Sequence, residues 1–259
     1  MDRLLKDIGT IEWSRATRGV LSGSERWRYV AAVLLVTMRA TPRLLLAKAG
    51  LWGSGADPSA FMPPDTALTR RVLEACKDIG PMLVTHGIRS YLYARALAKL
   101  ENLSCDDDAL FVAAVLHDFA FPVAPARVGD CCFSLAGAEA AAALLRDSDL
   151  SAVAQHAVLD AITLHLNPYV AREQGSLQYL LHAGVMVDAT GVRAWQLERE
   201  GVERVIEKHP RLGFPRHGLP AFREAGRLRG SRPAVALHCG FGSAMKMSPW
   251  GAYEAREVV

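Results

Sequence analysis

What this sequence lacks excludes several classes of protein. Its five cysteines are an odd set without CxxC spacing, so a disulfide framework is not expected. The formal net charge is only +3 and the Lys and Arg residues are scattered, which gives no basic surface for nucleic acid. The polar start "MDRLLKDIGTIEWSR" is not a secretory signal. We therefore expect a reduced, cytoplasmic protein without a nucleic-acid partner.

An apolar run long enough to span a membrane is also missing. The strongest candidate, "YVAAVLLVTM" at residues 29–38, is bracketed by Arg28 and Arg39 and has about half the length that a spanning helix requires. We expect a buried helix, either in an N-terminal cap or at a contact between copies of the chain, in preference to a helix docked at a membrane surface. Association into a homo-oligomer is left open.

The apolar residues that are present predict helices. They make up 51% of the 259 residues, enough for a sizeable core, and strand signals are nearly absent. Serine or aspartate stands at several expected starts, where a side-chain oxygen can cap a helix: Asp106 or Asp107, Ser134, Ser151 and Ser176. The fold class is therefore all-α, with segments of helical length between short breakers at 67–79, 82–101, 107–118, 134–146, 150–165, 176–189, 193–208 and 218–228.

A stretch rich in Gly, Pro, Ser and Asp divides the chain. It reads "LWGSGADPSAFMPPD" at residues 51–65, a composition that cannot easily continue a helix. We predict an N-terminal helical extension over residues 1–60 and a helical domain over 66–208. Residues 209–259 are rich in Pro, Gly and Arg, and we expect them to pack on that domain as loops and one short helix.

Polar residues interrupt the apolar faces of four predicted helices. His117 and Asp118 are adjacent in "AAVLHDFAF", while His86, His165 and Asp188 each come from a different segment. Burying an imidazole or a carboxylate without partners costs on the order of several kcal/mol. Two imidazoles and two carboxylates form a ligand set suited to divalent zinc, manganese, iron or cobalt. Spacing alone is equally consistent with a buried hydrogen-bonded cluster.

The order His86, His117-Asp118, Asp188 resembles the HD superfamily of metal-dependent hydrolases, over roughly residues 80–195. Within it the sequence is most similar to the cyanamide hydratase type, on the motifs "THGIRSYLYARAL", "AAVLHDF", "FSLAGAEAA", "AITLHL" and "VDATG". The resemblance implies an HD-domain helical bundle that holds one divalent ion. Zinc is the first choice, with iron, manganese or cobalt as alternatives, and the implied ligands are His86, His117, Asp118 and Asp188.

The resemblance also suggests roles around the ion. His165, together with Asp118, would perform the acid–base chemistry, although His165 could instead support the ligands. Arg89, one turn after His86, could bind an anionic substrate or pair with a neighbouring carboxylate. Candidate substrate-binding residues besides Arg89 are Asn167 and Arg172 in the loop "NPYVAREQG", and Phe121 in the apolar wall.

Departures from the family pattern narrow the expected reaction. The segment "CCFSLAGAEAA" lacks the extra histidine of two-metal members, and "FAFPVAP" lacks a carboxylate. These departures favour a mononuclear hydrolase or hydro-lyase acting on a small neutral substrate, such as cyanamide or another nitrile. A nucleotide or phosphate-ester phosphohydrolase is the first alternative, and it would need Arg89, Arg172 and Arg216 beside the ion. A catalytically degenerate HD module that only binds a ligand is the second.

Overall fold

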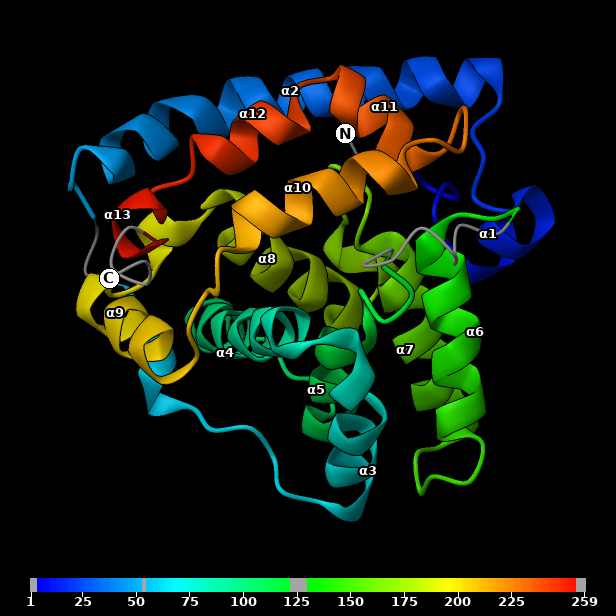
Figure 1. Cartoon of the computed structure of the whole chain (residues 1–259), viewed down its shortest axis with the longest axis horizontal. Coiled ribbons are helices and arrows are strands. Elements are labelled where there is room, and N and C mark those ends of the chain that lie inside the picture. Colours follow the sequence, from blue (N-terminus) through cyan, green and yellow to red (C-terminus); the bar gives the residue numbers. More distant parts are fainter. Residues whose placement is uncertain (1–3, 53–54, 122–129, 255–259) are drawn as a thin grey trace.

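The computed structural model describes residues 4–52, 55–121 and 130–254, and helices dominate these ranges (Figure 1). They contain no β-strand beyond two isolated bridges, Val20 with Ser231 and Ala56 with Leu197. The prediction of an all-α fold is confirmed. The helices are α1 (Ile11–Thr17), α2 (Gly23–Lys48), α3 (Ala67–Ala75), α4 (Pro81–Glu101), α5 (Asp107–Leu116), α6 (Phe133–Leu145), α7 (Ala152–Leu164), α8 (Ser176–Thr190), α9 (Arg199–Lys208), α10 (Phe214–Ala225), α11 (Arg232–His238), α12 (Phe241–Lys246) and α13 (Gly251–Glu254).

Two glycines set the spacing of the central helices α4, α5 and α8. A Cβ atom added to Gly87 in α4 would lie 2.6 Å from the carbonyl oxygen of Ala114 in α5. One added to Gly184 in α8 would lie 2.1 Å from the carbonyl oxygen of Ser90 in α4. Only glycine therefore lets these backbones approach so closely. The contact brings the polar residues of three helices within reach of one another.

The predicted helix caps are half correct. The Asp106 carboxylate accepts from the backbone N–H of Ala109 at 2.8 Å, and the Ser151 hydroxyl accepts from that of Ala154 at 3.2 Å. Ser134 and Ser176 lie inside their helices and cap nothing, so these two predictions are wrong. The Ser134 hydroxyl has another partner, because it accepts from Nη2 of the buried Arg232 at 3.1 Å.

Helix α2 differs from the predicted buried helix. It runs for 26 residues through Arg39 and Pro42. Residues on its inner side, such as Tyr29 and Ala32, are buried, and the Tyr29 hydroxyl donates to the Leu166 carbonyl at 2.7 Å. Only 11% of its most apolar window is buried, however, and by length and composition alone the helix could cross a membrane. Within a single chain the helix is therefore not buried as an N-terminal cap, because neither arginine nor Pro42 ends it and one side faces outward; burial at a contact between copies of the chain stays a prediction.

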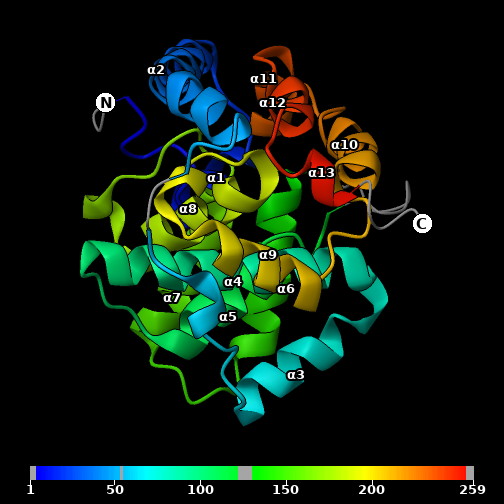
Figure 2. The same ribbon diagram turned by 90° about the vertical axis from the view of Figure 1, so that its left-hand side faces the viewer.

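The C-terminal part is more helical than predicted. Helices α10–α13 lie where the sequence indicated loops and one short helix. Helices α10, α11 and α12 lie on the same side of the bundle as α2 (Figure 2). A second apolar cluster forms beneath them, and it includes Leu83 of α4, Phe133 of α6 and Ala189 of α8. This cluster joins the C-terminal helices to the bundle beside the predicted site.

Candidate metal centre

Three of the predicted site residues converge in the interior. His86 lies in α4, and His117 and Asp118 follow the last residue of α5, where the chain leaves the helix. Neighbours within a helix point in different directions, so this end position allows both residues to face one point. The Nε2 atoms of His86 and His117 are 3.2 Å apart. The Oδ2 atom of Asp118 is 3.4 Å from the Nε2 atom of His117 and 3.8 Å from the Nε2 atom of His86.

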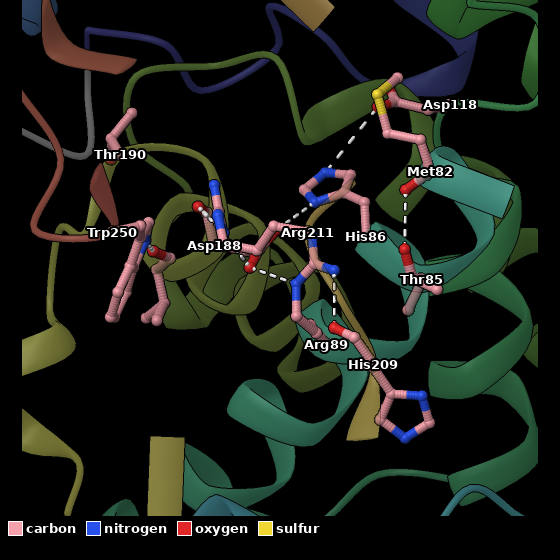
Figure 3. Close-up of polar contacts among 12 residues, drawn as sticks. Met82, Thr85, His86, Arg89, Asp118, Asp188, Thr190, His209, Arg211 and Trp250 are labelled. Atoms are coloured by element: carbon pink, nitrogen blue, oxygen red, sulfur yellow. Dashed lines mark hydrogen bonds and ion pairs between the residues drawn. The ribbon is translucent and has the colours of Figure 1, made fainter. Parts of the chain in front are cut away.

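Hydrogen bonds fix the tautomers of both histidines. The Nδ1 atom of His117 donates to the carbonyl oxygen of Ala114 at 2.7 Å, since a carbonyl can only accept. The Nδ1 atom of His86 donates to the Oδ2 atom of Asp188 at 2.6 Å. In each neutral ring the Nε2 atom then carries a lone pair. Figure 3 shows His86 between the two carboxylates, with Asp118 on one side and Asp188 on the other.

This donor set fits a metal ion. Two lone pairs and a carboxylate oxygen face one another in a buried place, where they repel unless a metal ion or a proton lies between them. Ligands at about 2.1 Å from a tetrahedral zinc are about 3.4 Å apart, close to the observed 3.2 to 3.8 Å. His86, His117 and Asp118 could therefore hold a metal ion, and two histidines with one carboxylate would leave positions open to other ligands.

The electrostatics of the site favour a cation. Burial by itself would raise the pKa of Asp118, but His117, His165 and His86 outweigh it and the pKa is lowered. Burial lowers the pKa of His117, but the Asp118 carboxylate outweighs burial and raises it. Asp118 is thus ionised at neutral pH, and the negative charge stabilises a positive charge beside it.

Asp188 is not placed as the predicted fourth ligand. Its Oδ1 atom accepts from Arg89 Nε and Arg211 Nη1, both at 2.8 Å, and its Oδ2 atom accepts from Arg89 Nη2 at 2.8 Å and from His86. Burial would raise the pKa of Asp188, but Arg211 and Arg89 outweigh it and hold the pKa well below its usual range. The two guanidinium groups keep the carboxylate behind His86, away from the Nε2 side. In this arrangement Asp188 supports His86 and does not join the group of His86, His117 and Asp118, so its role as a fourth ligand is not confirmed.

Arg89 is also not placed for substrate binding. It is fully buried, and besides Asp188 its Nη1 atom donates to the backbone carbonyls of His209 at 3.0 Å and Pro210 at 2.7 Å. These contacts tie α4 to the segment before α10. Two roles were predicted for Arg89. In the structure it pairs with a neighbouring carboxylate, that of Asp188.

The two loop residues predicted to bind substrate have other partners. Arg172 is exposed, pairs with Glu101 and lies over the ring of Tyr179, and it does not line the cavity beside the metal centre. Asn167 borders the cavity beside the metal centre, but its Nδ2 atom donates to the carbonyl of Ile8 at 2.7 Å and its Oδ1 atom accepts from Arg232 at 3.2 Å. The Asn167 amide thus anchors the N-terminal segment.

His165 lies beside Asp118. It follows the end of α7, and its Nδ1 atom donates to the Ile162 carbonyl at 2.6 Å, which leaves the lone pair on Nε2. That Nε2 atom is 3.7 Å from the Oδ1 atom of Asp118. Burial, with a smaller contribution from His117, lowers the pKa of His165 to about 3. At neutral pH the ring is neutral and has a free acceptor, which suits either acid–base chemistry or support of the ligands.

A cavity of about 310 Å³ borders the metal centre and is lined mostly by apolar side chains. Phe121 lines it as predicted; the rest of the "FAFPVAP" segment, from residue 122 on, lies outside the described residues. Phe214 stacks on His86 with ring centroids 4.2 Å apart, a contact that the sequence motifs did not predict. Further lining residues that sequence reasoning missed are Val33, Val36, Leu44, Phe133, Val185, Met186, Phe222, Phe241 and Met245.

No protein-family model matches this chain, and no curated protein matches it. The similarity to the HD superfamily therefore rests on the sequence motifs alone.

Proposed function

We propose that the protein is a metal-dependent HD-type hydrolase or hydro-lyase that acts on a neutral molecule. The observation that carries the proposal is the buried group of His86, His117 and Asp118, with its lone pairs directed at one point on the wall of an apolar cavity. Two histidines and one carboxylate with an open position are typical of catalytic metal sites. Zinc is the proposed ion, with iron, manganese or cobalt as alternatives.

A divalent ion held by these residues would act as a Lewis acid toward water or the substrate. His165 would accept a proton at Nε2, because its Nδ1 proton is donated to the Ile162 carbonyl and the lone pair is therefore on Nε2. Asp118 would stabilise the positive charge that His165 then carries, since its Oδ1 atom lies 3.7 Å away. Asp188 would hold the His86 ring in the orientation that presents Nε2.

The charges around the cavity favour a neutral substrate. Among the described residues that line it, Lys48 alone belongs to the Lys and Arg types, and that side chain is exposed. Arg89 and Arg211 are occupied by Asp188, and Arg172 and Arg216 are exposed, so these arginines do not form a phosphate clamp. These contacts favour a hydrolase or hydro-lyase that acts on a neutral molecule over a nucleotide or phosphate-ester phosphohydrolase.

The size of the cavity bears on the substrate. Its volume of about 310 Å³ falls in the range of ligand pockets, and cyanamide would fill only a small part of it. We therefore propose nitriles with an apolar body as substrates beside cyanamide. Water would add to the nitrile carbon as hydroxyl while one proton passes to the nitrogen, and transfer of the hydroxyl proton to the same nitrogen then gives the amide, or urea from cyanamide.

The test is a metal analysis of the purified protein combined with one panel of substrates. Cyanamide, benzonitrile and an aliphatic nitrile are compared with nucleotides and a generic phosphate ester, and Asp118→Asn serves as the inactive control. About one metal ion per chain and amide or urea formation that Asp118→Asn abolishes would support the proposal. Phosphate release would instead support a nucleotide or phosphate-ester phosphohydrolase. Metal binding without turnover of any substrate would favour a catalytically degenerate HD module that only binds a ligand.

A further inference from the structure

The outward side of α2 carries an apolar stripe. Trp27, Leu34, Met38 and Leu45 are 78%, 57%, 64% and 51% exposed. They are spaced seven, four and seven residues apart, which places them on one face of a helix that turns about 100° per residue. Large apolar side chains gathered on one exposed face mark an interaction surface.

Basic residues border this stripe. Arg26, Arg28, Arg39, Arg43 and Lys48 are all exposed. At about 100° per residue, Arg28 and Arg39 fall on one side of the stripe and Arg26 and Lys48 on the other, while Arg43 lies about 160° from it. The acidic residue of α2 is Glu25, whose carboxylate accepts from the backbone of Ser22 and from the Trp13 indole, both at 2.7 Å. The outward side of α2 is therefore both apolar and cationic.

The charge pattern selects the partner. If α2 helices from two copies of the chain packed along the stripe, cations would meet cations and Glu25 would remain in its cap. An anionic bilayer supplies both a complementary charge and an apolar layer, and the long arginine and lysine side chains can extend from the stripe toward the headgroups. Trp27 near one end of the stripe is of a residue type favoured at membrane interfaces.

The mouth of the cavity lies beside the stripe. The exposed residues that line the cavity include Thr41, Leu45 and Lys48 of α2 and Met247 just after α12. Leu45 thus belongs to both the stripe and the cavity. The opposite side of α2 is buried at Tyr29, which anchors the helix to the body through the Leu166 carbonyl.

We propose that α2 docks on the surface of an anionic membrane with Trp27, Leu34, Met38 and Leu45 inserted among the lipids. Because the inner side of the helix is packed on the protein, α2 lies in the plane of the membrane and does not cross it. The docking goes beyond the proposed catalytic function and does not depend on it. It sets the cavity mouth against the lipid, where apolar molecules concentrate.

The experiment is cosedimentation of the full chain with two kinds of vesicle. One is pure phosphatidylcholine and the other contains about 30% phosphatidylserine, at about 0.1 M and about 0.5 M NaCl. We expect binding to the anionic vesicles that is at least about tenfold tighter than to neutral ones and that is lost at the higher salt. The Leu34→Glu/Met38→Glu variant should lose binding about tenfold or more. Val153→Glu is the matched control, because Val153 is 80% exposed on α7, and it should bind as the wild type does.

A charge-only variant separates a membrane from a second copy of the chain. Arg26→Gln/Arg28→Gln should weaken binding to anionic vesicles and reduce its salt dependence, whereas removal of these cations would strengthen an α2–α2 dimer. Light scattering gives the oligomeric state of each variant. Equal binding of all variants, or a wild-type dimer that Leu34→Glu/Met38→Glu converts to monomers without any vesicle binding, would overturn the proposal.

Discussion

His86 donates from Nδ1 to Asp188 at 2.6 Å, while its opposite ring nitrogen, Nε2, lies 3.2 Å from that of His117. The hydrogen bond fixes the His86 tautomer and so decides which atom is presented to the metal centre. The two carboxylates of the site thus have different roles. Asp118 faces the ligand atoms, and Asp188 acts through the ring of His86.

Replacement of Asp118 by Asn should remove metal binding. The ion would lose the only charged ligand of the three-residue group, and the neutral amide would leave it held by two imidazoles. We expect added zinc to raise the melting temperature of the wild type, by an amount that corresponds to about 2.7 kcal/mol at a hundredfold excess over Kd. Asp118→Asn should show no such shift in the same thermal scan. A full zinc-dependent shift in this variant would disprove the assignment of Asp118.

Replacement of Asp188 by Asn is the same chemical change with a different expected result. It leaves the buried Arg89 and Arg211 without their carboxylate, so the free energy of unfolding should fall by about 3–5 kcal/mol. Metal affinity should drop about 10- to 100-fold but persist, because a supporting group is lost and not a ligand. Denaturant unfolding and chelator competition measure the two effects. If Asp188→Asn abolished metal binding at unchanged stability, Asp188 would be a ligand.

The sequence predicted the metal centre only in part. His117-Asp118 is a local motif at a helix end, and its meeting with His86 follows from helices that pack closely at Gly87. The position of Asp188 depends on Arg211, which is 23 residues away and folds back onto it. Pattern reasoning weighs each carboxylate by itself, so it could not tell which one a guanidinium would capture.

The helices of the bundle were predictable because their boundaries are local. The segments expected at 82–101 and 107–118 correspond to α4 and α5 within one or two residues, since breakers and Asp106 mark their ends. The exposure of α2 was not predictable, because an apolar run looks the same whether protein or another partner covers it. Apart from Phe121, the aromatic residues of the cavity wall were not predicted, since Phe214 and its neighbours reach the site only through the C-terminal helices.

Two histidines, the buried His165 and the half-buried His182, offer a matched test of acid–base chemistry. Burial lowers the pKa of His165 to about 3 and that of His182 to about 4, and each donates to a backbone carbonyl, of Ile162 and Asn167 respectively. Of the two, His165 lines the cavity. His165→Gln should therefore retain the metal ion and lower kcat about 10²- to 10⁴-fold, whereas His182→Gln should keep the turnover. Full activity of His165→Gln would assign it a supporting role.

The carboxylate of Asp160 should make stability depend on pH. Its Oδ1 atom accepts from the backbone N–H of Ile11 at 2.9 Å and its Oδ2 atom from Gln178 at 3.3 Å, which ties α1 and α8 to α7. Burial raises the pKa of Asp160 above 3.8 in spite of these bonds. The folded state therefore binds the proton more tightly than the unfolded state does. The stability that protonated Asp160 contributes is fully present below the unfolded-state pKa. It is lost as the pH rises through the higher folded-state pKa.

Asp160→Asn should remove this loss. The amide oxygen can still accept from Ile11, and the Gln178 side chain can rotate to accept from the new amide, so both contacts persist without a buried charge. Melting temperatures measured from about pH 4 to about pH 7 should show the variant gaining on the wild type as the pH rises. The exposed Asp147→Asn serves as the control and should follow the wild type. A constant difference across this range would mean that Asp160 ionises alike in the folded and unfolded chains.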